Sequence, residues 1–115
     1  MPTTIYKICD AARWRAAEAA NVFRGAGIDE RDGYIHFSGA GEVRETAARH
    51  FAGAADLVLI AVDAGRLGPA LKWERSRGGA LFPHLYGALD LDTVRWVKPL
   101  PLGADGRHAF PELDP

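Results

Sequence analysis

The densest group of chemically active side chains lies in one stretch, WERSRGGALFPHLYG, at positions 73–87. It places a carboxylate, guanidinium groups, a hydroxyl, an imidazole and a phenol around two adjacent glycines, with bulky apolar residues at both ends. The polar and glycine residues are Glu74, Arg75, Ser76, Arg77, Gly78, Gly79, His84 and Tyr86. Convergent polar groups in an apolar setting are typical of ligand pockets, so this composition favours a binding site over a solvated loop.

The residue types suggest how such a site would work. Adjacent glycines let the backbone approach a ligand closely or adopt positive φ. Arginine offers a rigid fork of donors that fits phosphate or carboxylate. Glu74 has two interpretations of equal weight: a general base or binder of a substrate hydroxyl, and an ion pair with Arg75, Arg77 or Arg49.

A second polar group lies in YIHFS, positions 34–38. In a strand, His36 shares one face with Tyr34 and Ser38, and the neighbouring apolar residues take the other face. The pattern therefore predicts a strand with one chemically usable face. A half-buried, hydrogen-bonded His36 is the alternative.

Several classes of site are disfavoured. The four histidines lack metal-ligand spacing, and no HExxH pattern occurs. Ser38 and Ser76 stand outside any GxSxG motif, which disfavours a hydrolase triad. The glycine-bearing segments match neither the phosphate-binding loop nor the dinucleotide fingerprint. His50 suits the C-terminal end of a helix, and His108, near the tail, is expected to be exposed.

Hydrophobic periodicity and turn signals predict the elements that position these residues. Helices are predicted over 11–23, with Asp10 as N-cap, and over about 41–51, with Ser38 as N-cap. Strands are predicted over 4–9, 34–38, 56–63 (buried on both faces), 71–75 and 93–102, with a turn that returns a last short strand. Residues 24–33 are predicted as a loop, and 76–87 as a loop with short extended pieces because Pro83 breaks long ladders. Strands that cluster after the helices favour an α+β fold, with the two early helices packed on the sheet.

Whole-chain properties predict a single domain over residues 1–115. The net charge of -1 gives no sign of nucleic-acid binding. The single cysteine, Cys9, excludes an internal disulfide and a cysteine-based zinc site, and a buried thiol in a strand is expected. No leader or membrane-spanning run is visible, so a cytoplasmic location is expected. The last residues, PELDP, are expected to fray.

Six segments together resemble one family, the bacterial and plant domain of unknown function 952. They are IYKI, DGYIHFS, TAARHFAG, DLVLIAVD, LKWERSRGGALFPHLYG and VRWVKPLPL. The resemblance covers about residues 4–102 and leaves a tail over 103–115. It implies a fold similar to that of ADP-ribosyltransferases, a split, mostly antiparallel sheet with a cleft that holds NAD in active relatives.

The resemblance also implies roles. YIHFS is similar to the Val-His-Leu-Ser type segment of the tRNA 2′-phosphotransferases, so His36 and Ser38 would contact the ribose or amide of NAD. Glu74 would be the acidic residue near the nicotinamide ribose, and Tyr86 or Tyr6 would fill the aromatic role. The pyrophosphate would be bound by Arg75, Arg77 or Arg49.

The expected function is therefore an NAD-binding, ADP-ribosyltransferase-like or NAD-processing enzyme, with Glu74, His36 and Tyr86 catalytic. NAD would be a substrate, and no metal is implied. The alternative is a non-catalytic module that binds a small anionic metabolite in the same cleft. The ligand-binding residues would be Ser38, Arg49, Arg75, Ser76, Arg77, Gly78, Gly79 and His84. Neither interpretation requires a nucleic acid or a membrane.

Overall fold

The computed structural model describes residues 3–114, apart from the side chain of Arg77. The described residues form three α-helices: α1 (Ala11–Ala20), α2 (Ile28–Asp32) and α3 (Val43–His50). Their strands are β1 (Thr4–Asp10), β2 (Val22–Phe23), β3 (Ile35–His36), β4 (Leu57–Asp63), β5 (Leu71–Arg75), β6 (Leu81–Leu85), β7 (Leu89–Asp90) and β8 (Val94–Leu100). Short 3₁₀ turns over 64–66, 68–70, 77–79 and 91–93 connect the later strands.

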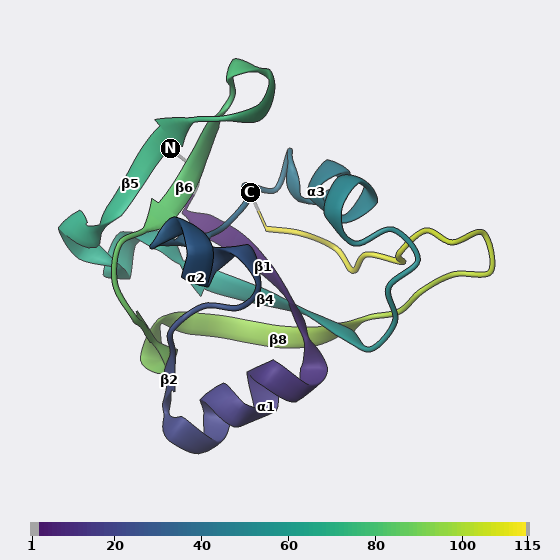
Figure 1. The fold of residues 1–115 in the computed structure, drawn as a ribbon, viewed down its shortest axis with the longest axis horizontal. Coiled ribbons are helices and arrows are strands. Elements are labelled where there is room, and N and C mark those ends of the chain that lie inside the picture. The colour runs from purple at the N-terminus through teal and green to yellow at the C-terminus, as the bar shows by residue number, and fades with distance from the viewer. Residues whose placement is uncertain (1–2, 115) are drawn as a thin grey trace.

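The strands form three antiparallel sheets (Figure 1). The main sheet has the order β1-β4-β8, a second has the order β3-β6-β5, and β2 pairs with β7. The predicted central strand is confirmed, because β4 lies between β1 and β8. The predicted α+β class is confirmed too.

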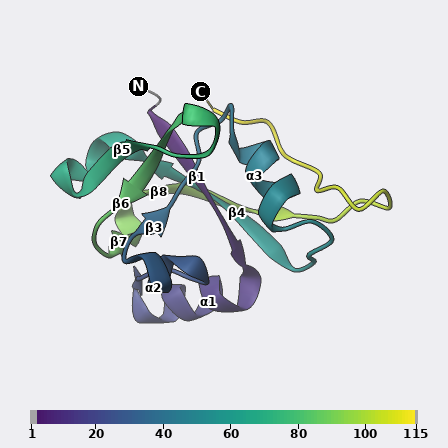
Figure 2. The same cartoon turned by 45° about the horizontal axis from the view of Figure 1, so that its top comes forward.

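The two larger sheets are joined at one point. Tyr6 of β1 and Ser38, just after β3, exchange two backbone hydrogen bonds of 2.8 and 2.9 Å. Beyond this bridge β1 and β3 are not paired with each other. The helices α2 and α3 lie on opposite sides of β1 (Figures 1 and 2). The sheet is therefore split at the place where YIHFS meets the N-terminal strand.

Alternation along β1 and β4 builds a core on each face of the main sheet. One core includes buried side chains from β1, α1, β2, β3, β4, β6 and β7, and Phe37 after β3: Ile5, Cys9, Trp14, Ala17, Phe23, Ile35, Phe37, Ile60, Val62, Leu85 and Leu89. The other lies under α3 and the C-terminal tail: Tyr6, Ile8, Val43, Ala47, Leu57, Leu59, Ala61 and Leu100. The buried thiol of Cys9 confirms that prediction.

The first helix begins as predicted but ends earlier. The carboxylate of Asp10 accepts a hydrogen bond of 3.1 Å from the backbone N–H of Arg13, which caps the helix. Asn21 adopts a left-handed conformation with φ 58° and stops the helix after Ala20. The prediction of helix through Phe23 is therefore wrong, because Val22–Phe23 leaves as strand β2.

Two further predictions before residue 50 are wrong. The loop predicted over 24–33 contains the helix α2, which ends at Gly33 with φ 82°. The N-cap of α3 is Glu42. Ser38 is held in the bridge to Tyr6 instead, and its Oγ lies 2.9 Å from Oγ1 of Thr46.

Pro83 does not break the strand that carries it. It lies inside β6, the middle strand of its sheet, opposite Trp73 of β5. The Pro83 carbonyl accepts a hydrogen bond of 3.0 Å from the N–H of Phe37, so its nitrogen faces the same side. Because proline has no N–H to return, the β3 ladder ends there after two residue pairs.

The C-terminal segment is anchored through residue 114. Phe110 and Leu113 pack against the second core, and the Tyr6 hydroxyl bonds to both the N–H and the C=O of Asp114, at 2.7 and 2.8 Å. His108 is half-buried, with Nε2 2.8 Å from the Ala54 carbonyl oxygen. Fraying of 111–114 and exposure of His108 were therefore wrong predictions, while Pro115 lies outside the described residues. The predicted last strand is present as a single bridge, Leu102 to His108.

Candidate functional site

A cleft of about 870 Å³ opens where β1 and β3 separate. Its volume is within the range of about 300–1,000 Å³ that is usual for small-molecule sites. Residues from β1, α1, α2, β3, α3 and the β5–β6 hairpin line it, among them Lys7, Ile8, Cys9, Asp10, Arg13, Asp29, Asp32, Tyr34, His36, Thr46, His50, Ser76 and His84. Residues of YIHFS (Tyr34, His36 and Phe37) and of the WERSRGGALFPHLYG hairpin (Ser76, Phe82 and His84) thus line the same cleft.

Glu74, His84 and Tyr86 form one hydrogen-bonded group at the hairpin. The antiparallel register sets Lys72 opposite His84, so Glu74 is the diagonal neighbour of His84 on the same face. One carboxylate oxygen, Oε1 of Glu74, lies 2.8 Å from His84 Nδ1 and accepts a 2.7 Å bond from the Tyr86 hydroxyl. The hydrogen bonds from His84 and then Tyr86 lower the pKa of Glu74. The bond to Glu74 and partial burial raise the pKa of Tyr86 to about 12.

Four aromatic rings pack against one another beside this group. The centroid of the Tyr34 ring lies 4.3 Å from that of His84, 4.5 Å from that of His36 and 5.0 Å from that of Tyr86. His36 and His84 are cross-strand partners of β3 and β6, with centroids 5.4 Å apart. The sheet register therefore brings together Glu74, His36, Tyr86 and His84, which sequence analysis selected from two distant segments.

A buried carboxylate holds the other side of the cleft. Oδ2 of Asp29 lies 2.7 Å from Lys7 Nζ and accepts a 2.9 Å bond from the Ala26 N–H. Its Oδ1 lies 2.6 Å from His36 Nδ1 and accepts a 3.0 Å bond from the His36 N–H. Burial alone would raise the pKa of Asp29, but the bond from His36 and the charge and bond of Lys7 outweigh it and lower the pKa to about 2. The pair Lys7–Asp29 thus spans the split between β1 and α2.

Both ring nitrogens of His36 face carboxylates. Nδ1 contacts Asp29, and Nε2 lies 3.0 Å from Oδ2 of Asp32. Because a carboxylate only accepts hydrogen bonds, Nδ1 carries a hydrogen, and the charge of Asp32 lies beside Nε2. His36 is therefore half-buried and hydrogen-bonded, as in the alternative interpretation of this residue.

The remaining predicted ligand-binding residues occupy different places. Ser76 lines the cleft, whereas Ser38 is buried in the bridge. Arg49 pairs with Glu45 on the exposed face of α3, with 3.2 Å between Nε and Oε1. Arg75 donates a 3.0 Å bond to the Gly79 carbonyl and closes the hairpin turn.

The adjacent glycines have the predicted conformation, with φ 69° at Gly78 and 79° at Gly79. A Cβ atom added to either glycine would meet no other atom within 4 Å. The positive φ, and not crowding by neighbours, therefore requires glycine at these two positions. The side chain of Arg77 lies outside the described residues.

Sequence analysis missed Lys7, Asp29 and Tyr34 as site residues. A lysine in the apolar strand TIYKIC was an available signal, because a buried lysine needs a partner. Asp29 gave no comparable signal inside the polar segment IDERDG. Tyr34 was placed on the face of His36 by alternation, but nothing in its type marked it as the ring on which the others pack.

The peptide group of Ile8 adds backbone polarity to the cleft. Successive peptides of a strand point to opposite sides, so the N–H and C=O of Ile8 point the same way as those of Tyr6. Tyr6 uses that side for the bridge to Ser38, and Ile8, one step further, lines the cleft. One donor and one acceptor therefore face the open space.

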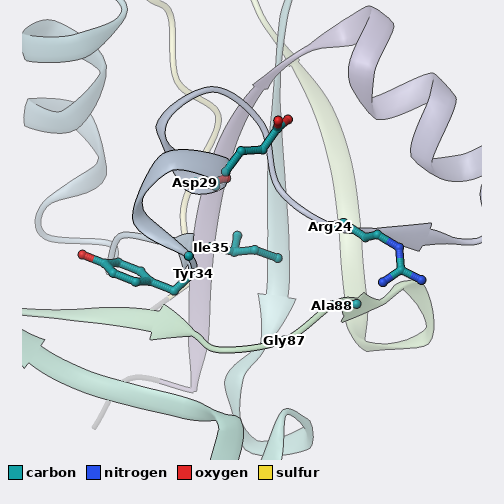
Figure 3. Close-up of a pocket in the computed structure, with 8 residues that line it drawn as sticks. Arg24, Asp29, Tyr34, Ile35, Gly87 and Ala88 are labelled. Atoms are coloured by element: carbon teal, nitrogen blue, oxygen red, sulfur yellow. The ribbon is translucent and has the colours of Figure 1, made fainter.

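A smaller hollow of about 320 Å³ lies beside the cleft. Tyr34 and Asp29 line both, so they form part of the wall between them. Figure 3 shows the aromatic ring of Tyr34 pointing away from Arg24, which lies near Ala88. Arg24 thus belongs to the hollow and not to the cleft.

Two kinds of feature are absent from the described part of the chain. Its residues contain no cluster of three or more His, Cys, Asp or Glu side chains that could hold a metal ion. No helix among them is both long and apolar enough to cross a membrane.

Burial raises the pKa of Cys9 to about 11, so this cleft-lining thiol is a poor nucleophile.

Comparison with known proteins gives a family and a fold. Two solved structures of protein CC0527 from Caulobacter crescentus are similar to this chain. The crystal structure is 50% identical, with a TM-score of 0.90, and the match covers 93% of this chain and 94% of that one. The solution NMR structure is 51% identical, with a TM-score of 0.82, over 91% and 90% of the two chains.

A search of curated proteins gave no match. The model of a family described as "Protein of unknown function (DUF952)" matches residues 8–97. That range lies inside the predicted region of resemblance and includes the cleft residues from Ile8 to His84. The chain therefore belongs to the DUF952 family of proteins of unknown function.

Proposed function

We propose that this chain binds NAD in the cleft between β1 and β3 and breaks the bond between nicotinamide and ribose. The observation that carries the proposal is the ring wall of Tyr34, His36 and His84, held by carboxylates at the edge of an 870 Å³ cleft. Departure of nicotinamide leaves positive charge on the ribose carbon. Fixed carboxylates in a partly buried site stabilise such charge without reorganisation.

Other cleft groups suit the remaining parts of NAD. The Ile8 peptide offers a donor and an acceptor, which is the pattern that the nicotinamide carboxamide needs. Arg13 lines the cleft from α1 and, among the arginine side chains that the structure describes, is the one placed to bind the pyrophosphate. The role of Glu74 beside the ribose stays a prediction, since His84 lines the cleft and Glu74 contacts it from behind.

Amide NMR during titration with NAD, ADP-ribose or buffer tests the binding. Saturable shifts at residues 7–9, 34–38 and 82–84 are expected with NAD, and the absence of shifts at millimolar NAD would reject the proposal. Arg13→Gln should weaken NAD binding about tenfold, as expected for one charge-assisted contact. Arg49→Gln, outside the cleft, is the matched control and should leave the affinity unchanged.

A second function has one observation in its favour. The guanidinium groups of Arg49 and Arg75 are engaged away from the cleft, so two of the arginines predicted for the pyrophosphate do not line it. This favours non-catalytic binding of a smaller anionic metabolite. An assay for free nicotinamide separates the two: NAD-induced shifts without nicotinamide release would reject the enzyme and leave the binder.

A further inference from the structure

We infer that His84 is the proton-accepting residue of the cleft and that Glu74 is its positioning residue. This deepens the proposed function, on which the identity of the reaction rests, by assigning a base and a class of acceptor. Sequence analysis gave His84 only a ligand-binding role.

The orientation of His84 fixes which nitrogen carries the proton. Its Nδ1 lies 2.8 Å from Glu74 Oε1, and a carboxylate only accepts hydrogen bonds, so Nδ1 carries a hydrogen. In the neutral ring Nε2 is then the acceptor. The side chain is 6% exposed and lines the cleft, and no hydrogen bond joins its Nε2 to another of the described residues. Nε2 is not one of their fully buried atoms without a partner, which are Thr4 Oγ1 and Trp14 Nε1, so a ligand or water in the cleft can donate to it.

His36 cannot be the proton acceptor of the cleft in the same arrangement. Its Nδ1 is hydrogen-bonded to Asp29, and a carboxylate oxygen of Asp32 lies 3.0 Å from its Nε2, in the place that a donor group of a ligand would need. The two histidines are cross-strand partners with different surroundings: two carboxylates lie beside His36 and one beside the more deeply buried His84. The three-dimensional setting thus reverses the order of importance that sequence analysis gave them.

Neighbouring groups keep the imidazole and its carboxylate in place. The Tyr34 ring packs at 4.3 Å on one side of His84, and the Tyr86 hydroxyl donates to the same oxygen of Glu74. That second donor favours the ionised form of Glu74, which can hold Nδ1–H but cannot give its own proton to His84. The group is therefore arranged to accept a proton from the cleft side.

The proposed reaction is a single substitution at the ribose C1′ of NAD. The oxygen of an acceptor O–H forms a bond to the ribose C1′ of NAD as the C1′–N bond breaks. The electron pair of that bond returns to the pyridinium nitrogen, and nicotinamide leaves as a neutral molecule. The acceptor proton moves to Nε2 of His84 and then to solvent. A base is needed when the attacking atom carries a proton, which excludes a carboxylate, and the acceptor class that we assign is water or an alcohol.

The first test needs no ligand. Long-range ¹H–¹⁵N correlation spectra of the neutral imidazole, recorded at alkaline pH, should show His84 with a protonated Nδ1 and a bare Nε2. His36, whose Nδ1 is hydrogen-bonded to Asp29, should also show a protonated Nδ1. A hydrogen on Nε2 of His84 would overturn the inference. In Glu74→Gln the fixed tautomer should be lost, and its survival would overturn the positioning role.

The second test uses NAD. His84→Gln should keep the NAD-induced amide shifts and reduce nicotinamide release at least about 100-fold, the range of a lost general base. His108→Gln, at a residue that does not line the cleft, is the matched control. Release by His84→Gln within about threefold of wild type would overturn the inference and leave the proposed function standing. Failure of wild type to bind or cleave NAD would reject the proposed function. The tautomer spectra would then decide whether Nε2 of His84 is the proton-accepting atom of the cleft.

Discussion

Replacement of Asp29 by asparagine should destabilise the fold strongly. All four groups that contact the Asp29 carboxylate are donors: Lys7 Nζ, His36 Nδ1 and the N–H groups of Ala26 and His36. An asparagine keeps the shape but must turn its NH₂ group toward two of them. It also leaves Lys7, which is 7% exposed, without its counter-charge. Loss of one partner of a buried ion pair costs about 3–5 kcal/mol, and we expect a loss in that range.

The same carboxylate predicts a pH dependence. The pKa of Asp29 falls from 3.8 to about 2 on folding. A tenfold change in proton affinity is worth about 1.4 kcal/mol, so the wild type gains about 2 kcal/mol from this group. A lowered carboxyl pKa stabilises the fold fully above pH 4, and the gain is lost as the pH falls toward 2. Asp29→Asn should lack this part of the acid sensitivity.

Urea unfolding followed by Trp fluorescence at several pH values measures both effects. Asp32→Asn is the matched control, since Asp32 also contacts His36 but is partly exposed, and it should cost less than about 1 kcal/mol. A double-mutant cycle with Lys7→Met should give a coupling of about 1–3 kcal/mol. A loss below about 1 kcal/mol for Asp29→Asn would refute the reasoning, because the pair would then not be desolvated.

Three further outcomes are expected. The thiol of Cys9 is buried with a pKa of about 11, so a disulfide reagent should modify it at least about 100-fold more slowly in the native protein than in denaturant; equal rates would contradict its burial. Tyr86→Phe removes one donor to Glu74, so the pKa of that carboxyl should rise in a ¹³C NMR titration, and an unchanged value would refute the hydrogen bond. Tyr6→Phe removes both bonds to Asp114 and should cost about 1–3 kcal/mol in urea unfolding. A neutral effect would show that apolar packing alone holds the tail.

Much of the fold could be predicted from local patterns. The alternation in TIYKIC and the apolar run DLVLIAVD identify β1 and β4 because their burial follows from residue type alone. Two of the errors share one cause, since each depends on a partner distant in sequence. Pro83 lies inside β6, where the β3 ladder ends, and Ser38 is held by Tyr6 instead of capping α3.

The site was predicted in composition but not in its contacts. Sequence analysis selected Glu74, His84, Tyr86 and His36, and the structure brings them together. It could not show that His36 is enclosed by two carboxylates while His84 has one, since that difference depends on the helix α2. The short α2 gave too weak a periodic signal to be recognised.

The contact between Tyr6 and Asp114 also bears on how the chain folds during synthesis. It joins residues 108 positions apart. The apolar surface under Phe110 and Leu113 therefore stays open on a nascent chain until residue 114 has left the ribosome. Contacts of such long sequence separation form late, because the entropy of closing the intervening chain must first be overcome. One face of the main sheet is thus completed only after translation of this segment, and until then it is the surface that a chaperone would meet.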